Sequence, residues 1–195
     1  NSMGGSAVAP ITQNYDTQIA KPENPAREHY TFVGWYDSED NPISFPYTIT
    51  DNITVYAKWQ INSYTMIFDS EGGSSVTPVR QEYGTQVTKP ADPTRYGFTF
   101  SGWYTGENGT GTVISFPYTL VGDITVHAKW TAGTFTMTFD SEGGSAVASI
   151  SGDFGDYVST SEVPTKAGYT FEGWYSNPGG TGSKVLMISR DTFLP

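Results

Sequence analysis

The sequence has no cysteine, only two histidines and no long apolar run among its 195 residues. Without cysteine, neither a disulfide nor a thiolate metal site can reinforce the fold. No stretch approaches the roughly 20 apolar residues that a membrane-spanning helix needs, so we predict no membrane insertion. Basic residues are also scarce: 20 acidic against 10 basic residues give a formal net charge of −10. This balance argues against nucleic acid as a partner, because nucleic acid attracts cationic surfaces.

Aromatic residues are abundant, at 15% of the chain, and they recur in a fixed motif. Trp35, Trp103 and Trp174 each follow a glycine and precede a tyrosine, and they are 68 and then 71 residues apart. Between Met66–Tyr104 and Met137–Tyr175, 19 of 39 aligned positions are identical. Repetition with this period predicts a tandem array of similar small units.

The array divides into three units, which we number repeats 1 to 3 and place at 1–60, 61–131 and 132–195. Repeat 2 is predicted to be complete, whereas repeat 1 lacks most of its first strand and repeat 3 lacks its last strand. A unit that lacks a strand presents an unpaired edge, where edge-strand contacts with another chain would form. Three units of about 70 residues in line predict an elongated array.

The aromatic motif predicts a core strand in each unit, because aromatic and β-branched residues favour half-buried strands. Side chains alternate along a strand, so strict alternation would separate Trp103 from Phe100. We expect a bulge at the glycine before each tryptophan (Gly34, Gly102 and Gly173) to turn the indole back to the core. The alternative is an exposed Trp-Tyr platform that stacks on a sugar or a peptide. The predicted core residues are Phe32, Trp35, Trp59, Phe68, Phe100, Trp103, Trp130, Phe139, Phe171 and Trp174.

The sequence of repeat 2 predicts a β-rich unit, in which two strands are followed by a proline-rich connecting segment (the crossing) and then by two further strands. The crossing, Thr88–Arg95, contains Pro90 and Pro93 and has room for at most one short helical turn. Glycine-rich Gly106–Gly111 is typical of a hairpin tip. The predicted strands are Tyr64–Asp69, Val76–Tyr83, Gly97–Tyr104 and Ile124–Trp130.

Three motifs, in a fixed order within 70 residues, resemble the Listeria–Bacteroides repeat, which is the B-repeat of internalin-type surface proteins. They are Phe-Asp-Ser-Glu-Gly-Gly-Ser at 68–74, Gly-Phe-Thr-Phe-Ser-Gly-Trp-Tyr at 97–104 and Ile-Thr-Val-His-Ala-Lys-Trp at 124–130. The resemblance covers essentially the whole chain. It implies tandem β-grasp-like (ubiquitin-like) units in an extracellular protein, either at the bacterial cell wall or secreted. It also implies a stalk or spacer role and brings no catalytic residues, although 88–95 leaves little room for a β-grasp helix.

No residue pattern predicts an enzyme, a cofactor or a metal site. The acidic turns Asp69–Gly73 and Asp140–Gly144 could each suggest a calcium loop, but an EF-hand loop needs more acidic residues and a glutamate at its twelfth position. His127 is predicted on the outward face of its strand, with no cysteine or paired histidine to complete a zinc site. Lys58 and Lys129 are expected to make simple cation–π contacts or to be solvated, rather than to form isopeptide cross-links.

Two functions remain open at this stage. The first is a structural spacer, and the second is an adhesin module that binds a host protein or glycan weakly and multivalently. The adhesin surface would be formed by exposed aromatics, Tyr56, Tyr104 and Tyr118, or by the variable tips at 37–42, 105–112 and 176–183. Outward positions differ between the repeats while core positions persist, which favours the spacer.

Overall fold

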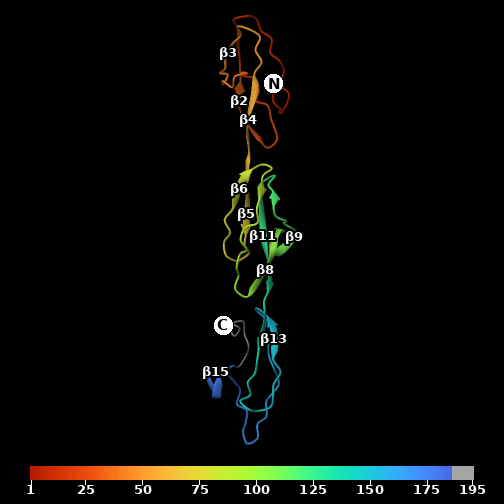
Figure 1. Cartoon of the computed structure of the whole chain (residues 1–195), viewed down its shortest axis with the longest axis vertical. Helices are drawn as coiled ribbons and strands as arrows, with labels where there is room; N and C mark the ends of the chain where they lie inside the picture. Colours follow the sequence, from red (N-terminus) through yellow and green to blue (C-terminus); the bar gives the residue numbers. More distant parts are fainter. Residues whose placement is uncertain (186–195) are drawn as a thin grey trace. The chain divides into compact units, whose positions relative to one another are not determined.

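The computed structural model describes residues 1–185, and nearly all of their regular structure is β-strand (Figure 1). The predicted β-rich class is therefore confirmed. The described residues contain two three-residue 3-10 turns, Glu107–Gly109 (η1) and Pro178–Gly180 (η2). None of their helices is long and apolar enough to cross a membrane. The last ten residues assigned to repeat 3, 186–195, lie outside the described part of the chain.

The chain separates into two compact units, and each is described by itself. The first unit comprises Asn1–Ile67, Thr77–Lys89 and Ser115–Thr125. The second comprises Phe68–Val76, Pro90–Ile114 and Val126–Pro195. The division passes through repeat 2, since Thr77–Lys89 and Ser115–Thr125 belong to the first unit and Phe68–Val76 and Pro90–Ile114 belong to the second.

In repeat 1, two antiparallel pairs of strands are formed. Strand β2 (Tyr30–Tyr36) pairs with β4 (Tyr56–Ile61), and the short β1 (Gln18–Ile19) pairs with β3 (Tyr47–Thr48). In repeat 3, the described pairs are β12 with β13 and β14 with β15. Their bounds are Thr134–Met137, Ile150–Asp153, Trp174–Asn177 and Thr181–Val185.

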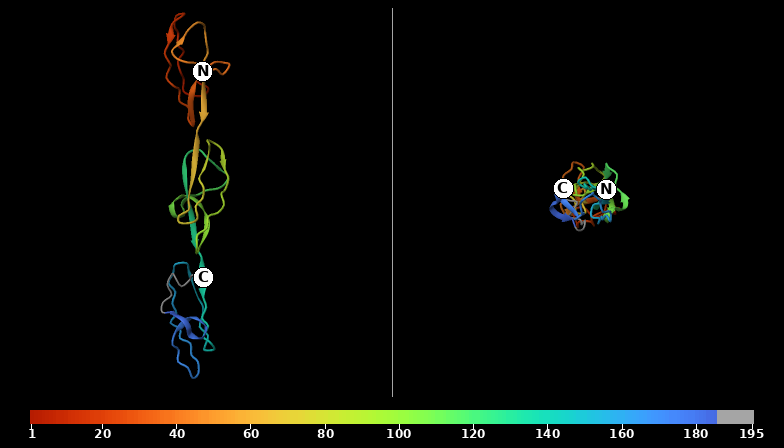
Figure 2. Two further views of the ribbon diagram at one scale, coloured as in Figure 1. Left: turned by 90° about the vertical axis from the view of Figure 1, so that its left-hand side faces the viewer. Right: turned by 90° about the horizontal axis from the view of Figure 1, so that it is seen from below.

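The strands of repeat 2 form a five-stranded sheet in the order β6-β5-β11-β8-β9, coloured yellow to teal in Figures 1 and 2. A separate two-stranded ladder joins β7 (Gln86–Val87) to β10 (Tyr118–Thr119). The sheet strands are β5 (Ser63–Asp69), β6 (Val79–Glu82), β8 (Phe98–Gly106), β9 (Thr110–Val113) and β11 (Ile124–Ala132). Strands β5, β8 and β11 match predictions closely, and β6 is shorter than predicted.

The connector 88–95 contains no helical turn, which is within the predicted limit of one short turn. Strand β9 and the β7–β10 ladder were not predicted. Strand β9 forms because the tip at η1 folds it back on β8, where Val113 pairs with Tyr104. The β7–β10 ladder is held by backbone bonds between distant segments: the Leu120 amide donates to the Thr85 carbonyl oxygen at 2.9 Å. Two-residue strands of this kind have too few side chains to show an alternating pattern.

The predicted bulges are confirmed in the first two repeats. On β8, Phe100 pairs with Trp130 and Gly102 pairs with Lys129, so Ser101 is the extra residue. On β2, the register shifts in the same way between Phe32 and Gly34. Gly102 has φ +131°, a conformation that favours glycine. The bulge turns the following indole inward, as expected.

The tryptophan after each of these bulges lies in the core, with Trp35 and Trp103 only 3% and 1% exposed. Trp103 meets Phe68 and Phe100 edge-on, with ring centroids 5.0 and 5.3 Å apart. The other predicted core aromatics, apart from buried Phe68 and exposed Phe171, are half-buried: Phe32, Trp59, Phe100, Trp130, Phe139 and Trp174.

The placement of Phe171 in the core is wrong, because its side chain is 36% exposed. Its ring meets Trp174 edge-on at 5.1 Å. The equivalent Phe100 is covered on a second side by Trp130, with centroids 5.5 Å apart. No tryptophan in the described part of repeat 3 covers Phe171 in the same way. The second side of the Phe171 ring therefore lacks the indole contact that Phe100 has.

Candidate functional site

The tight turn at 70–73, which follows β5, is hydrogen-bonded to β11, the last strand of repeat 2. The Trp130 indole N–H donates to the Ser70 carbonyl oxygen at 2.9 Å, and the Gly73 amide donates to the same oxygen at 2.9 Å. A Cβ at Gly73 would lie 2.4 Å from the Trp130 ring. Repeat 1 has the same arrangement, with Trp59 donating to Ser2 at 3.0 Å. Trp130 therefore requires glycine at position 73, whereas Gly72 has φ +84°, a conformation that favours glycine.

We expect Gly73→Ala to lower the free energy of unfolding of repeat 2 by about 1–2 kcal/mol, because the new methyl group collides with the Trp130 ring. Thermal unfolding together with hydrogen exchange on β5 and β11 would measure the loss. Gly122→Ala is the matched control, since a Cβ at Gly122 meets nothing within 4 Å. Equal melting temperatures for the two variants would show that the turn can move away from the ring.

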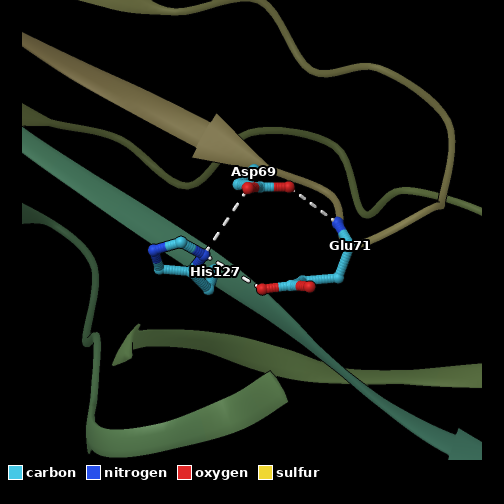
Figure 3. A group of neighbouring side chains, drawn as sticks. All are labelled: Asp69, Glu71 and His127. Carbon is cyan, nitrogen blue, oxygen red and sulfur yellow. Dashed lines mark hydrogen bonds and ion pairs between the residues drawn. The ribbon is translucent and has the colours of Figure 1, made fainter. Parts of the chain in front are cut away.

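The same turn brings three polar side chains together (Figure 3). Asp69 ends β5, Glu71 lies in the turn and His127 projects from β11. The His127 Nδ1 atom is 3.0 Å from Glu71 Oε1 and 3.6 Å from Asp69 Oδ2. The side chains of His127 and Glu71 are 15% and 20% exposed, whereas Asp69 is 52% exposed. We call these three residues the His-carboxylate cluster.

Backbone amides hold the two carboxylates in place. Asp69 Oδ1 accepts a bond from the Glu71 amide at 3.0 Å, and Glu71 Oε1 accepts a bond from the Asn108 amide of the η1 tip at 3.2 Å. Repeat 3 has equivalent bonds: the Glu142 amide donates to Asp140 at 2.9 Å, and the Gly179 amide donates to Glu142 at 3.0 Å. The acidic pair thus orders the turn and the tip in both repeats.

The prediction that His127 lies on an open outward face without convergent partners is wrong. The turn after β5 folds back over that face of β11 and brings two carboxylates to the imidazole. A comparison between repeats could have revealed the site. Where repeat 2 has Asp69, Glu71 and His127, repeat 1 has Asn1, Met3 and Tyr56, so all three positions change together.

The three tyrosines proposed as a ligand surface lie on different strands. Tyr56 is on β4, Tyr104 on β8 and Tyr118 on β10, and all three are half-buried. The Lys129 ammonium lies 5.1 Å from the centre of the Tyr104 ring, which is the expected cation–π contact. None of the three is fully exposed, although the adhesin hypothesis expected exposed aromatic rings.

Lys58 makes the equivalent cation–π contact in repeat 1, 4.5 Å from the Tyr36 ring. Its ammonium also donates to both carboxylate oxygens of Asp40. This hydrogen bond raises the pKa of Lys58 above its ordinary value. The lysine therefore contacts a carboxylate on the tip at 37–42 as well as the Tyr36 ring.

Successive repeats are joined by a single residue between two strands. Strand β4 ends at Ile61 and β5 begins at Ser63, so Asn62 alone connects them. Strand β11 ends at Ala132 and β12 begins at Thr134, so Gly133 alone connects them. Links this short limit the freedom of the segments that they join.

Each linking residue is also hydrogen-bonded on both sides. The Asn62 amide donates to the His29 carbonyl oxygen, and its own carbonyl oxygen accepts from the Tyr83 amide, both at 2.9 Å. The Gly133 amide donates to Gly97 at 2.8 Å, and its carbonyl oxygen accepts from Phe154 at 2.7 Å. We call each set of three residues a junction clamp.

Ring contacts accompany both junction clamps. At the first, the His29 imidazole stacks on the Tyr83 ring with centroids 3.7 Å apart, and its Nδ1 lies 3.1 Å from the Tyr64 hydroxyl. At the second, the Phe154 ring covers Gly97, where a Cβ would lie 2.3 Å from that ring. Phe154 also meets Phe98 edge-on at 5.4 Å. One residue from each of two successive repeats thus meets in a ring contact at both junctions.

Comparison with known proteins places this architecture among known repeats. The profile of the Listeria-Bacteroides repeat domain matches three successive segments, 1–58, 64–129 and 135–192. Two proteins of Evansella cellulosilytica, a putative Gly-rich membrane protein and a putative membrane protein, are each 37% identical to this chain over 90% and 89% of its length. Internalin H of Listeria monocytogenes is 35% identical over 62% of the chain. The chain spans 21%, 27% and 23% of the lengths of these three relatives.

Proposed function

Because the chain belongs to the Listeria–Bacteroides repeat family, we propose that it is a non-catalytic spacer segment of a bacterial cell-surface or secreted protein. Its units are repeats 1 to 3 as defined above. The junction clamps are the observation that carries this proposal. In a spacer, each repeat must hold the next one at a fixed distance and orientation, and a flexible linker would not do so. Both clamps instead use one residue with hydrogen bonds in both directions.

The clamps support a spacer because they depend on backbone atoms. Asn62 and Gly133 differ in side chain, yet both donate and accept the equivalent main-chain bonds. Such bonds can be repeated at every junction of a longer array without requiring the same linker residue. Relatives several times longer than this chain are consistent with further segments around it.

We also propose that each repeat is a β-grasp-like unit. The five-stranded sheet of repeat 2 supports this assignment. The proline-rich connector 88–95, which has no helical turn, takes the place of the helix that a complete β-grasp has. Comparison of an experimental structure of repeat 2 with ubiquitin-like folds would test it.

Small-angle X-ray scattering tests the spacer directly. A 70-residue unit has a radius of gyration of about 11 Å, and three units in line are expected to give a maximum dimension of at least about 80 Å. The reason is that each clamp allows little folding back of one repeat on the next. The same scaling gives a single 195-residue globule a diameter of about 42 Å, and a maximum dimension near that value would contradict the proposal.

The competing function is an adhesin that binds a host protein or glycan weakly and multivalently. The contacts of Tyr56, Tyr104 and Tyr118 do not favour it, since these rings are half-buried on three strands. Multivalent display of the fragment on beads, followed by binding to a glycan array and to host cells, separates the two functions. Saturable binding that Tyr104→Ala removes without unfolding would support the adhesin and not the spacer.

A further inference from the structure

We propose that the His-carboxylate cluster of repeat 2 is a binding site for a divalent transition metal ion, with zinc as the best-fitting cation. Asp69, Glu71 and His127 each offer one ligand atom, and these atoms all lie within 4.8 Å of one another. They come from β5, the turn that follows it and β11, and Figure 3 shows the Asp69 and Glu71 side chains beside the His127 ring. An ion held there would tie the turn after β5 to β11.

Two of the three distances between the ligand atoms are close to those of tetrahedral coordination. Zinc bonds of about 2.0–2.2 Å to nitrogen and oxygen place neighbouring ligand atoms about 3.3–3.6 Å apart. The His127 Nδ1 atom lies 3.0 Å from Glu71 Oε1 and 3.6 Å from Asp69 Oδ2. The first distance is slightly shorter than the tetrahedral separation, and the second lies at its upper end. Small side-chain adjustments would therefore suffice to accept an ion.

The type of donor selects the ion. Imidazole nitrogen suits zinc, copper, iron and nickel, whereas calcium and magnesium require oxygen ligands. A calcium site is therefore a poor fit to a cluster in which the imidazole is central. The two carboxylates also supply two negative charges, which a divalent cation balances.

The turn and the tip do not need the histidine for their own order. In repeat 3, Glu142 accepts the equivalent bond from the tip amide of Gly179, and no imidazole joins it among residues 1–185. The acidic pair therefore has a structural role that is complete without His127. The imidazole adds a third ligand atom to a pair already fixed by backbone amides, and these amides reduce the side-chain entropy lost on binding an ion.

Repeat 1 provides substitutions with which to test the site. Its residues at the three equivalent positions are Asn1, Met3 and Tyr56, none of which carries a carboxylate or an imidazole. His127→Tyr and Asp69→Asn therefore introduce side chains that the fold already accommodates in a sister repeat. Two matched controls leave the cluster intact: His29→Gly removes the other histidine, and Asp140→Asn alters the equivalent turn of repeat 3.

The experiment is calorimetric titration of zinc chloride into the whole chain after removal of metals with a chelator. We expect binding of one ion, tetrahedral cobalt absorption when cobalt replaces zinc, and a zinc-dependent rise in melting temperature. His127→Tyr and Asp69→Asn should each weaken binding by about tenfold or more, because the first removes the nitrogen ligand and the second replaces a charged carboxylate ligand by a neutral amide. His29→Gly and Asp140→Asn should bind as the original chain does.

Two results would overturn the site. One is the absence of zinc binding up to millimolar concentration. The other is binding that persists unchanged in His127→Tyr or in Asp69→Asn, which would place the ion elsewhere on the acidic surface. The melting temperatures of both variants without zinc show whether they are folded. If His127→Tyr does not fold, the nearly isosteric Asp69→Asn decides the question.

Discussion

Replacing Trp103 with alanine is expected to lower the free energy of unfolding of repeat 2 by about 3–5 kcal/mol. Trp103 is 1% exposed and meets both Phe68 and Phe100 edge-on. Its removal leaves a cavity at the centre of a small unit whose total stability is only about 5 kcal/mol or somewhat more. Thermal unfolding, with hydrogen exchange measured on β8 and β11, would locate the loss in repeat 2.

Two further variants show whether the effect comes from burial. Tyr169→Ala removes a 73% exposed aromatic and should change stability by no more than about 0.5 kcal/mol. Trp103→Phe should retain more stability than Trp103→Ala, since it keeps a ring and removes a buried indole N–H that has no partner among residues 1–185. If Trp103→Ala melts like Tyr169→Ala, the indole does not hold the core.

The core strand was predictable because its determinants are neighbours in the sequence. Alternation alone would have turned Trp103 away from Phe100, but the glycine before it signals a bulge, and Gly102 adopts φ +131° at that bulge. Phe171 shares this local motif, and its exposure was still missed. Its burial depends on an indole from a distant strand, which no motif around it reports.

The His-carboxylate cluster could not be predicted from strand periodicity. Alternation places His127 outward, and only the fold-back of a turn 56 residues earlier in the chain covers that face. The junction clamps are even harder to predict from the sequence than the cluster is. They are built from main-chain amides and carbonyl oxygens, which every residue except proline carries, so Asn62 and Gly133 can serve equally. What periodicity reveals is which side chains share a face, not which segments fold back on it.

The second junction clamp gives the other large expected effect. Gly133→Pro removes the amide that donates to the Gly97 carbonyl oxygen at 2.8 Å and leaves this acceptor without its bond. We expect the clamp to lose about 3 kcal/mol, from the lost bond and the restricted backbone. Because the core residues around Trp103 are untouched, repeat 2 should keep its own melting temperature while the orientation of repeat 3 relative to it becomes variable.

Spin-label distance measurements can detect this uncoupling, because the chain has no cysteine and labels can be attached at chosen sites. Val113→Cys on β9 and Ser183→Cys on β15 place one label in repeat 2 and one in repeat 3. The distance distribution should broaden strongly in Gly133→Pro. Gly133→Ala keeps the amide, although its Cβ lies 3.2 Å from the Gly97 carbonyl oxygen, and should broaden the distribution much less. Equal, narrow distributions in all three proteins would mean that the Phe154 ring contacts hold the junction without the amide, and the spacer would then depend on side-chain packing instead of on the backbone.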